Sequence, residues 1–304
     1  MSQLGYACIC LSLPGYTTNR TMRKATFQQK GMDYVSDLTL QNVSDIIHIL
    51  KWNKSQSINF FRLSSCLVPW GDKLDITKLK DYDAIAYELR KAGEYALQNG
   101  IRITTHPGPF CILSSPNDSV VQSAIDDLEL HAQIFDLMGL SQSPYNKINI
   151  HMGGTYGDKV AAMDRFCDNF SRLSKSAQSR LTLENDDKAS LYSVKDLMHV
   201  HNRIGIPIVF DYHHHQCQQD PMSQEDALRL AASTWPIGIP PVVHYSESKA
   251  LHEGDSKIKI QAHSDYITSL PDTYGVDVDI MVEAKKKELA ILPYLQEYKL
   301  KQAA

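Results

Sequence analysis

Residues 181–215 read LTLENDDKASLYSVKDLMHVHNRIGIPIVFDYHHH and contain the pattern that decides the fold. Residues 181–184 and 207–211 are short runs that are apolar on both faces, as expected for parallel strands covered by helices. Residues 193–203, between them, have a helical pattern. The two expected strands end on carboxylates, Glu184 and Asp211. The stretch therefore predicts a strand–helix–strand unit with an acidic side chain at the carboxyl end of each strand.

The same alternation of short apolar runs and helical patterns extends over the whole chain. Further strands are expected at residues 4–10, 58–63, 101–105, 148–151, 242–245 and 278–282. Further helices are expected at residues 42–54, 82–98, 119–138, 159–176, 223–233 and 284–299. This order of α and β elements indicates a (β/α)8 TIM barrel, with a doubly wound open sheet as the alternative. Because no linker or break in composition interrupts it, we expect one domain spanning residues 1–304.

The composition limits the classes of function. Hydrophobic residues make up 43% of the 304 residues and charged residues 22%, which is typical of a soluble globular protein. The net charge of −4 gives no global basic field, so any site for a polyanion must be a local patch or depend on bound cations. The six cysteines form no CxxC pair, and the N-terminal segment has neither an export signal nor a membrane span. We therefore expect a soluble, intracellular protein.

Metal-binding types of side chain stand at or just past the carboxyl ends of successive predicted strands. They are His106, His151, Glu184, Asp211, His214, His244 and Glu283, with His263 in the loop between the last two strands. In a TIM barrel those strand ends converge on one face, where the loops build the active site. The sequence therefore predicts one cluster of imidazoles and carboxylates at the mouth of the barrel.

Such a cluster would be unfavourable without cations, because its carboxylates repel one another and lose solvation. Mixed nitrogen and oxygen ligands suit manganese or zinc, whereas magnesium is less favoured by histidine; cobalt is a further alternative. Eight candidate ligands exceed what one ion needs, so we expect two or three divalent ions. Glu184, Asp211 and Glu283 are the expected catalytic carboxylates.

Each of these motifs also has a simpler interpretation. The DYHHH segment at residues 211–215 could be a solvated polar loop, and in an extended segment His213 and His215 would point away from His214, so we exclude both as ligands. The ENDD segment at residues 184–187 could cap a helix. The glycines of HMGGTYGDK could serve a tight turn or allow a phosphate to approach the backbone. Tyr156 in this segment is a candidate for contact with DNA or a lesion.

A basic segment precedes the second strand. Residues 16–30 read YTTNRTMRKATFQQK and include Arg20, Arg23 and Lys24 but no acidic residue. We expect this segment in the first loop on the catalytic face. It is either a solvated basic loop or a clamp for a phosphodiester backbone.

The motifs resemble, in order, those of the UV damage endonucleases. They include GYACICLSL, TNRTMRKATF, FRLSS, HPGPF, NIHMGG, LTLEND, PIVFDYHHH, VHYSES, AHSDYI and DVDIMVEAKKKELA, and they cover residue 4 to about residue 292. The resemblance implies a TIM barrel similar to endonuclease IV and to the xylose isomerase-like barrels. It also implies an enzyme that cuts duplex DNA immediately 5′ to pyrimidine dimers, 6-4 photoproducts and some other lesions. Such an enzyme would leave a 3′-hydroxyl and a 5′-phosphate and use a cluster of divalent ions, commonly manganese.

The resemblance also assigns roles to individual residues. His106 and His151 correspond to ligands of one metal site. The residues that correspond to ligands of the other sites are Glu184, Asp211, His214, His244, His263 and Glu283. Tyr6 matches a position that probes the lesion, and Pro109-Phe110 replaces a glutamine followed by an aromatic residue. Phe110 can still wedge or stack between bases, whereas Pro109 supplies no amide.

Three further departures from the family pattern concern the predicted site. Cys10 replaces an asparagine, and Val242 replaces a lysine that can be modified in the family. A histidine that usually follows FRLSS is missing, and Asp72 or Lys73 stands near its place. We therefore expect a changed ligand set beside His106 and His151, with Asp72 as the candidate substitute.

Three alternatives to a UV damage endonuclease remain open on the sequence. They are an apurinic-site endonuclease, a damage-binding protein with weak or no catalysis, and a sugar isomerase or epimerase on the same fold. The favoured interpretation predicts damaged double-stranded DNA as the partner, a monomeric protein and no association with membranes.

Overall fold

The computed structural model describes residues 3–71 and 74–295. Eight parallel strands, each hydrogen-bonded to the next, close into a barrel, with β8 pairing with β1. The strands are β1 Leu4–Ala7, β2 Phe60–Leu63, β3 Arg102–Thr105, β4 Ile148–His151, β5 Leu181–Glu184, β6 Ile208–Asp211, β7 Val242–Tyr245 and β8 Asp279–Val282. The predicted TIM barrel is confirmed.

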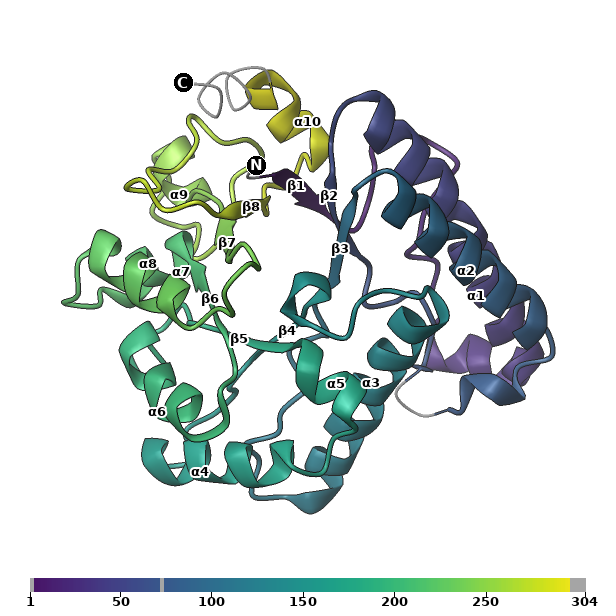
Figure 1. The fold of residues 1–304 in the computed structure, drawn as a ribbon, viewed down its shortest axis with the longest axis horizontal. Helices are drawn as coiled ribbons and strands as arrows, with labels where there is room; N and C mark the ends of the chain where they lie inside the picture. Colours follow the sequence, from purple (N-terminus) through teal and green to yellow (C-terminus); the bar gives the residue numbers. More distant parts are fainter. Residues whose placement is uncertain (1–2, 72–73, 296–304) are drawn as a thin grey trace.

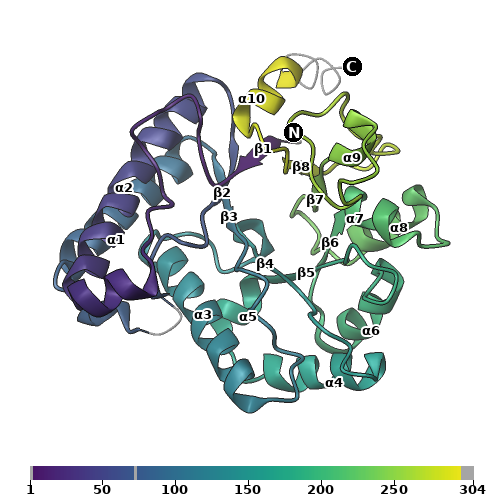
Figure 2. The same cartoon turned by 180° about the vertical axis from the view of Figure 1, so that it is seen from behind.

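Helices surround the barrel, as Figures 1 and 2 show from its two ends. They are α1 Lys24–Ser55, α2 Tyr82–Gln98, α3 Asp118–Leu137, α4 Lys159–Phe170, α5 Lys175–Arg180, α6 Val194–Ile204, α7 Tyr212–Gln218, α8 Gln224–Ser233, α9 Lys249–Glu253 and α10 Glu288–Ile291. Short 3-10 helices in the described connections include Ile76–Lys78, Pro144–Asn146 and Leu292–Tyr294. Within the described residues, no helix combines the length and the apolar character that crossing a membrane requires.

The structure corrects several predicted boundaries. The first strand ends at Ala7, because Cys8 has a positive φ of 73° that extended backbone does not allow. The helix expected at 159–176 is two helices, since the side chain of Ser174 caps a new helix by accepting a hydrogen bond from the Ala177 amide. The helix expected at 42–54 is part of α1, which begins at Lys24 and is interrupted at Gly31, where φ is 65° and ψ is −161°. Of the helix expected at 284–299, the described part contains α10, and residues 296–299 lie outside the described residues.

The segment that follows β6 is also a correction. The exclusion of His213 and His215 as ligands rests on an extended segment at residues 211–215, but α7 begins at Tyr212, directly after the strand. Asp211 caps this helix, because its side chain accepts a hydrogen bond from the His214 amide at 2.7 Å. His213 and His215 are buried against other parts of the chain, while His214 turns toward the barrel mouth.

The amino-terminal end of the barrel is closed by a buried ion pair. Arg102 and Asp279 begin β3 and β8, and both side chains are essentially inaccessible to solvent. Arg102 donates a hydrogen bond to the Asp279 carboxylate at 2.6 Å and three more to the backbone carbonyl oxygens of Tyr145, Pro240 and Pro144. Each nitrogen of the guanidinium therefore donates at least one hydrogen bond, as a buried charge requires.

Removing one member of this pair should strongly destabilise the fold. Asp279→Ala leaves the Arg102 charge buried without its counter-ion, and we expect a loss of about 3–5 kcal/mol in the free energy of unfolding. Chemical denaturation measures the loss. Asp168→Ala, which breaks an exposed pair with Arg203, is the control and should cost about 1 kcal/mol or less. Equal losses in the two variants would contradict the role assigned to Asp279.

Candidate metal centre

Strand register brings the predicted ligands to one level of the barrel. In the parallel pairing, His151 of β4 lies opposite Glu184 of β5, and Asp211 of β6 lies opposite His244 of β7. His106 directly follows β3, and Glu283 directly follows β8. These side chains therefore meet at the carboxyl end of the barrel, where the catalytic sites of such barrels lie.

Glu184 is at the centre of the group. Its Oε2 atom lies 3.0 Å from Nδ1 of His244, 3.2 Å from Nε2 of His106 and 3.9 Å from Nε2 of His151. Its Oε1 atom lies 3.2 Å from Nδ1 of His214. One buried carboxylate thus contacts imidazoles delivered by four different strands or helices.

Two more carboxylates complete the centre. Oε1 of Glu283 lies 3.2 Å from Nδ1 of His244, and the same carboxylate forms an ion pair with Arg62 of β2. Asp211 is fully buried, and its Oδ2 atom has no hydrogen-bond partner among the described residues. The structure therefore brings together seven of the eight residues predicted as ligands within a chain of direct contacts through Glu184, His244 and His214.

The eighth, His263, lies at the edge of this group. It comes from the segment between α9 and β8, and its Nδ1 atom lies 2.7 Å from Oγ of Ser246. Burial lowers the pKa of His263 to about 4, although the nearby charge of Glu283 acts in the opposite direction. His263 thus faces the carboxylates of the centre without joining the closest set of ligand atoms.

The crowding of like and unlike charges shifts the titration of these groups. Burial raises the pKa of Asp211 to about 7, and the negative charges of Glu184 and Glu283 add to that shift. Burial lowers the pKa of His244 to about 4. The pKa of Glu184 lies well below its usual range despite burial, because imidazoles led by His244 surround it. Without cations, burial and neighbouring charges thus hold the pKa values of these groups away from their usual ranges. Bound cations would stabilise the charged carboxylates.

The donor set fits divalent cations. Two triads have ligand atoms within 4.8 Å of one another: His106, His151 and Glu184, and Glu184, Asp211 and His244. Glu184 belongs to both, so it is placed to bridge two ions. Oδ2 of Asp211 is buried without a hydrogen-bond partner within the described part of the chain, and Nδ1 of His244 makes no hydrogen bond there despite lying 3.0 Å from the Glu184 carboxylate. Buried polar atoms without partners are unfavourable, and a shared cation would satisfy both.

Sequence reasoning missed four residues that contact the centre. Arg62 pairs with Glu283, Asn149 donates a hydrogen bond to Glu184, and Oδ1 of Asp186 lies 3.2 Å from Nδ1 of His151. Lys147 is fully buried, with Nζ 3.1 Å from Nε2 of His244. Strand alternation could have found Asn149, which precedes His151 by two residues and shares its face.

The residues predicted to contact lesions divide into two groups. Pro109 and Phe110 are exposed beside His106 on the catalytic face, and Phe110 as a residue is 86% exposed. Tyr156 is 47% exposed in the loop after β4, with a positive φ of 51° and the guanidinium of Arg165 over its ring at 5.6 Å. All three are therefore accessible to a large ligand.

Tyr6, by contrast, is fully buried. Its hydroxyl donates a hydrogen bond to the Asn53 side chain at 2.7 Å, and its ring packs against Phe61 at 5.1 Å between centroids. The side chain points toward α1 rather than into the barrel mouth. This placement contradicts the prediction that Tyr6 contacts DNA. Cys10 is buried as well, and Val242 lies in the barrel interior, while Asp72 and Lys73 lie outside the described residues.

The basic segment is only partly a loop. Arg23 and Lys24 are exposed, but α1 begins at Lys24, so residues 24–30 are helical and not part of the loop that we expected. Arg20 is partly buried and pairs with Asp45 at 2.7 Å. Arg23 and Lys24 therefore remain as accessible cations on this side of the barrel.

Comparison with known proteins matches this arrangement to a family. The family model described as UV-endonuclease UvdE matches residues 2–303. The chain belongs to the UV-endonuclease UvdE family. Among curated relatives, a UV DNA damage endonuclease of Bacillus cereus strain Q1 is 33% identical over 309 residues, which cover 97% of this chain and 94% of the relative. The resemblance noted in the sequence is confirmed.

Two other members of the family are longer. The UV-damage endonuclease of Schizosaccharomyces pombe is 36% identical over 98% of this chain, and that of Neurospora crassa is 38% identical over 89%. The aligned parts make up 51% and 42% of those proteins, so the chain spans about half the length of these relatives or less.

Solved structures agree with the family assignment. The crystal structure of SacUVDE has a TM-score of 0.86 and 30% identity, with 99% of each chain covered. Endonuclease IV from Thermus thermophilus has a TM-score of 0.57 at 10% identity and covers 99% of this chain and 100% of its own. An L-ribulose 3-epimerase has a TM-score of 0.54 at 14% identity and covers 79% of this chain and 76% of its own. The last two share the barrel fold alone.

Proposed function

We propose that the protein is an intracellular, monomeric, metal-dependent DNA repair endonuclease that hydrolyses the phosphodiester immediately 5′ to UV photoproducts in duplex DNA. The observation that carries the proposal is the buried group of carboxylates and imidazoles around Glu184 at the barrel mouth. Family membership and the names of the relatives, UV-damage endonucleases, support the substrate. The products would be a 3′-hydroxyl and a 5′-phosphate.

We propose two or three divalent ions as cofactors, with manganese first and zinc, magnesium or cobalt as alternatives. When bound, such ions supply positive charge that polarises a phosphate and acidifies water. His106 and His151 would hold one ion, Glu184 would bridge to the next, and Asp211 and His244 would hold it from the other side. The mixture of imidazole and carboxylate ligands favours manganese or zinc over magnesium.

The other residues of the centre fix these ligands in place. Arg62 holds the Glu283 carboxylate, and Asn149 holds Glu184, so neither carboxylate is free to swing out of the centre. Hydrogen bonds of this kind to metal ligands orient them and raise metal affinity. Asp211 is held by the helix that it caps, because its side chain accepts a hydrogen bond from the His214 amide of α7.

Damaged DNA would lie across the mouth. Arg23 and Lys24 would contact the phosphodiester backbone, and Phe110 and Tyr156 would stack on bases near the lesion. A damaged step is already weakly stacked, so extruding it costs less than the few kcal/mol needed for an intact one. Lesion selection would follow from this difference.

Phe110 provides a test of the stacking role. We expect Phe110→Ala to weaken binding to an oligonucleotide with a pyrimidine dimer by about 1–3 kcal/mol, which corresponds to roughly 5- to 150-fold in Kd. Fluorescence anisotropy with metal-free protein measures the change. Tyr87→Ala, which removes a 65% exposed aromatic side chain from α2, is the control and should bind normally. Unchanged binding by the Phe110 variant would exclude stacking.

A plasmid assay tests the function itself. Purified protein with Mn²⁺ should convert irradiated supercoiled plasmid to the nicked form and leave untreated plasmid intact. Oligonucleotides with a pyrimidine dimer or an abasic site then separate the proposed activity from an apurinic-site endonuclease. Binding to irradiated DNA without cleavage under any of the four metals would instead identify a damage-binding protein.

A further inference from the structure

His263 differs from the other candidate ligands in how it is held. The others lie within, directly after or three residues past a barrel strand, whereas His263 belongs to a long connection without strands between α9 and β8. Residues on such connections are normally more mobile than those on strands. A metal ligand in this position needs contacts that fix both its backbone and its ring.

The ring of His263 is fixed by Ser246. Ser246 follows His244 by two residues, and its side chain is 3% exposed. Its Oγ atom lies 2.7 Å from Nδ1 of His263. Because this contact occupies Nδ1, Nε2 remains as the nitrogen that can coordinate an ion.

The backbone of His263 is fixed by the segment that leaves β7. Ser248 and His263 form an isolated antiparallel bridge. On its two sides, the Lys249 amide donates to the Ala262 carbonyl at 2.7 Å, and the Ser264 amide donates to the Glu247 carbonyl at 2.8 Å. This single bridge and its two flanking hydrogen bonds thus set the position of the His263 backbone.

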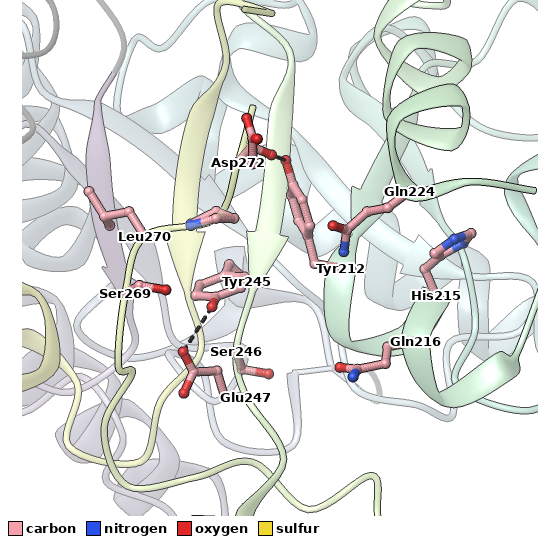
Figure 3. Close-up of a pocket in the computed structure, with 11 residues that line it drawn as sticks. Tyr212, His215, Gln216, Gln224, Tyr245, Ser246, Glu247, Ser269, Leu270 and Asp272 are labelled. Atoms are coloured by element: carbon pink, nitrogen blue, oxygen red, sulfur yellow. Dashed lines mark hydrogen bonds between the residues drawn. The ribbon is translucent and has the colours of Figure 1, made fainter. Parts of the chain in front are cut away.

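The side chain of Glu247 ties the same two segments together. It accepts a hydrogen bond from the Tyr245 hydroxyl at 2.8 Å (Figure 3). It also accepts hydrogen bonds from both the amide and the hydroxyl of Thr268 at 2.9 Å. It also pairs with His252 of α9. One carboxylate therefore links the end of β7, the short helix and the chain that follows His263.

Packing is incomplete beside these hydrogen bonds. A pocket of about 490 Å³ lies there, lined by Tyr245, Ser246 and Glu247, by residues of α7 and α8, and by residues 269–272 of the connection itself (Figure 3). Farther along, Ile267 of the connection is buried in the hydrophobic core. On the pocket side, the segment is therefore held by the polar contacts of Glu247 and Ser246.

We propose that Ser246 and Glu247 are positioning residues that hold His263 ready to bind one ion of the metal centre. The inference rests on the proposed metal-dependent function and adds residues that act through His263 rather than on the substrate. Ser246 selects the nitrogen that coordinates, and Glu247 holds the segment that carries the ring.

Manganese binding without DNA tests this inference. We expect Ser246→Ala to raise the Kd of one Mn²⁺ ion by roughly 10- to 100-fold and to leave the Kd of the other ions unchanged. Electron paramagnetic resonance, which detects free Mn²⁺, measures the change in a titration. Ser246→Thr, which keeps the hydroxyl, should restore most of the affinity. Ser248→Ala is the matched control, because the Ser248 hydroxyl is equally buried but has no hydrogen-bond partner in the described part of the chain.

The outcomes separate the inference from the function on which it rests. If Ser246→Ala binds Mn²⁺ as the wild type does, the positioning role is wrong while the metal centre stands. If the wild type binds no Mn²⁺ at all, both fail. The imidazole nitrogen spectrum of zinc-loaded wild type gives a second test that needs no Ser246 variant, with His263→Gln to assign the signal: a proton on Nδ1 supports the proposal, and a proton on Nε2 overturns it.

Discussion

Glu184→Gln should lower the rate of DNA nicking by roughly a thousandfold or more, because it removes the one carboxylate that contacts both triads of the centre. The loss corresponds to about 4 kcal/mol of transition-state stabilisation, a typical share for charge supplied through a metal site. Glutamine has the same shape and can still accept the hydrogen bond from Asn149. The barrel should therefore stay folded, with an unfolding temperature close to that of the wild type.

The measurement is the initial rate of nicking of irradiated plasmid at saturating Mn²⁺. Asp187→Asn serves as the matched control, because it neutralises a carboxylate in the same loop that lies outside both triads. We expect near-normal nicking from this control. A Glu184→Gln protein that nicks at the normal rate would remove Glu184 from the catalytic site.

Removing divalent ions should abolish nicking, and adding Mn²⁺ should restore it. The carboxylates of Glu184, Asp211 and Glu283 cannot supply positive charge to a phosphate, so the metal-free protein should show at least about a thousandfold loss. Protein treated with EDTA and then passed through a desalting column is assayed with and without Mn²⁺. Protein treated with EDTA already saturated with Mn²⁺ is the control.

The same ions should stabilise the fold. At a free Mn²⁺ concentration about one hundred times Kd, the binding of each ion adds about 2.7 kcal/mol to the free energy of unfolding. The effect should disappear in a variant that loses both Glu184 and Asp211, whose ligand atoms belong to the second triad. Full nicking activity in protein shown to be free of metal would contradict the metal requirement.

Much of the barrel could be predicted from the sequence. The runs at 148–151, 181–184 and 242–245 coincide with β4, β5 and β7, because buried parallel strands are apolar on both faces and end abruptly at polar residues. The helix predicted at 82–98 coincides with α2, which ends where Asn99 and Gly100 allow the chain to turn. Strong local sequence patterns thus predict most of the strands and helices of the barrel.

The same property explains the error at Tyr6. Both faces of a barrel strand are buried, so apolar character does not tell which side chains point into the barrel and which toward the helices. Tyr6 points toward α1, where the Asn53 side chain accepts a hydrogen bond from its hydroxyl. Only the closure of the sheet decides this orientation, and closure depends on residues far apart in the chain.

The helix α7 was missed for a different reason. Its sequence, YHHHQCQ, has no apolar period that would indicate a helix. The helix is set instead by the Asp211 cap and by burial of Tyr212 and His215 against neighbouring elements. Tertiary packing therefore overrides the local pattern where the chain places His214 at the metal centre.

The clustering of the predicted ligands followed from a general rule about barrels. The residues that hold those ligands in place could not be predicted in this way. Carboxyl ends of barrel strands meet at one face, which was enough to gather His106, His151, Glu184, Asp211 and His244. The contacts made by Arg62, Lys147 and Ser246 come from residues with no metal-binding chemistry of their own. Their roles depend on distances that only a structure provides.

Anomalous X-ray scattering from crystals grown with MnCl₂ tests the central claim most directly. Data collected at the manganese absorption edge should show at least two peaks at the barrel mouth, one beside His106, His151 and Glu184 and one beside Glu184, Asp211 and His244. A mouth without any manganese peak, in crystals of a preparation that nicks irradiated plasmid, would contradict the account.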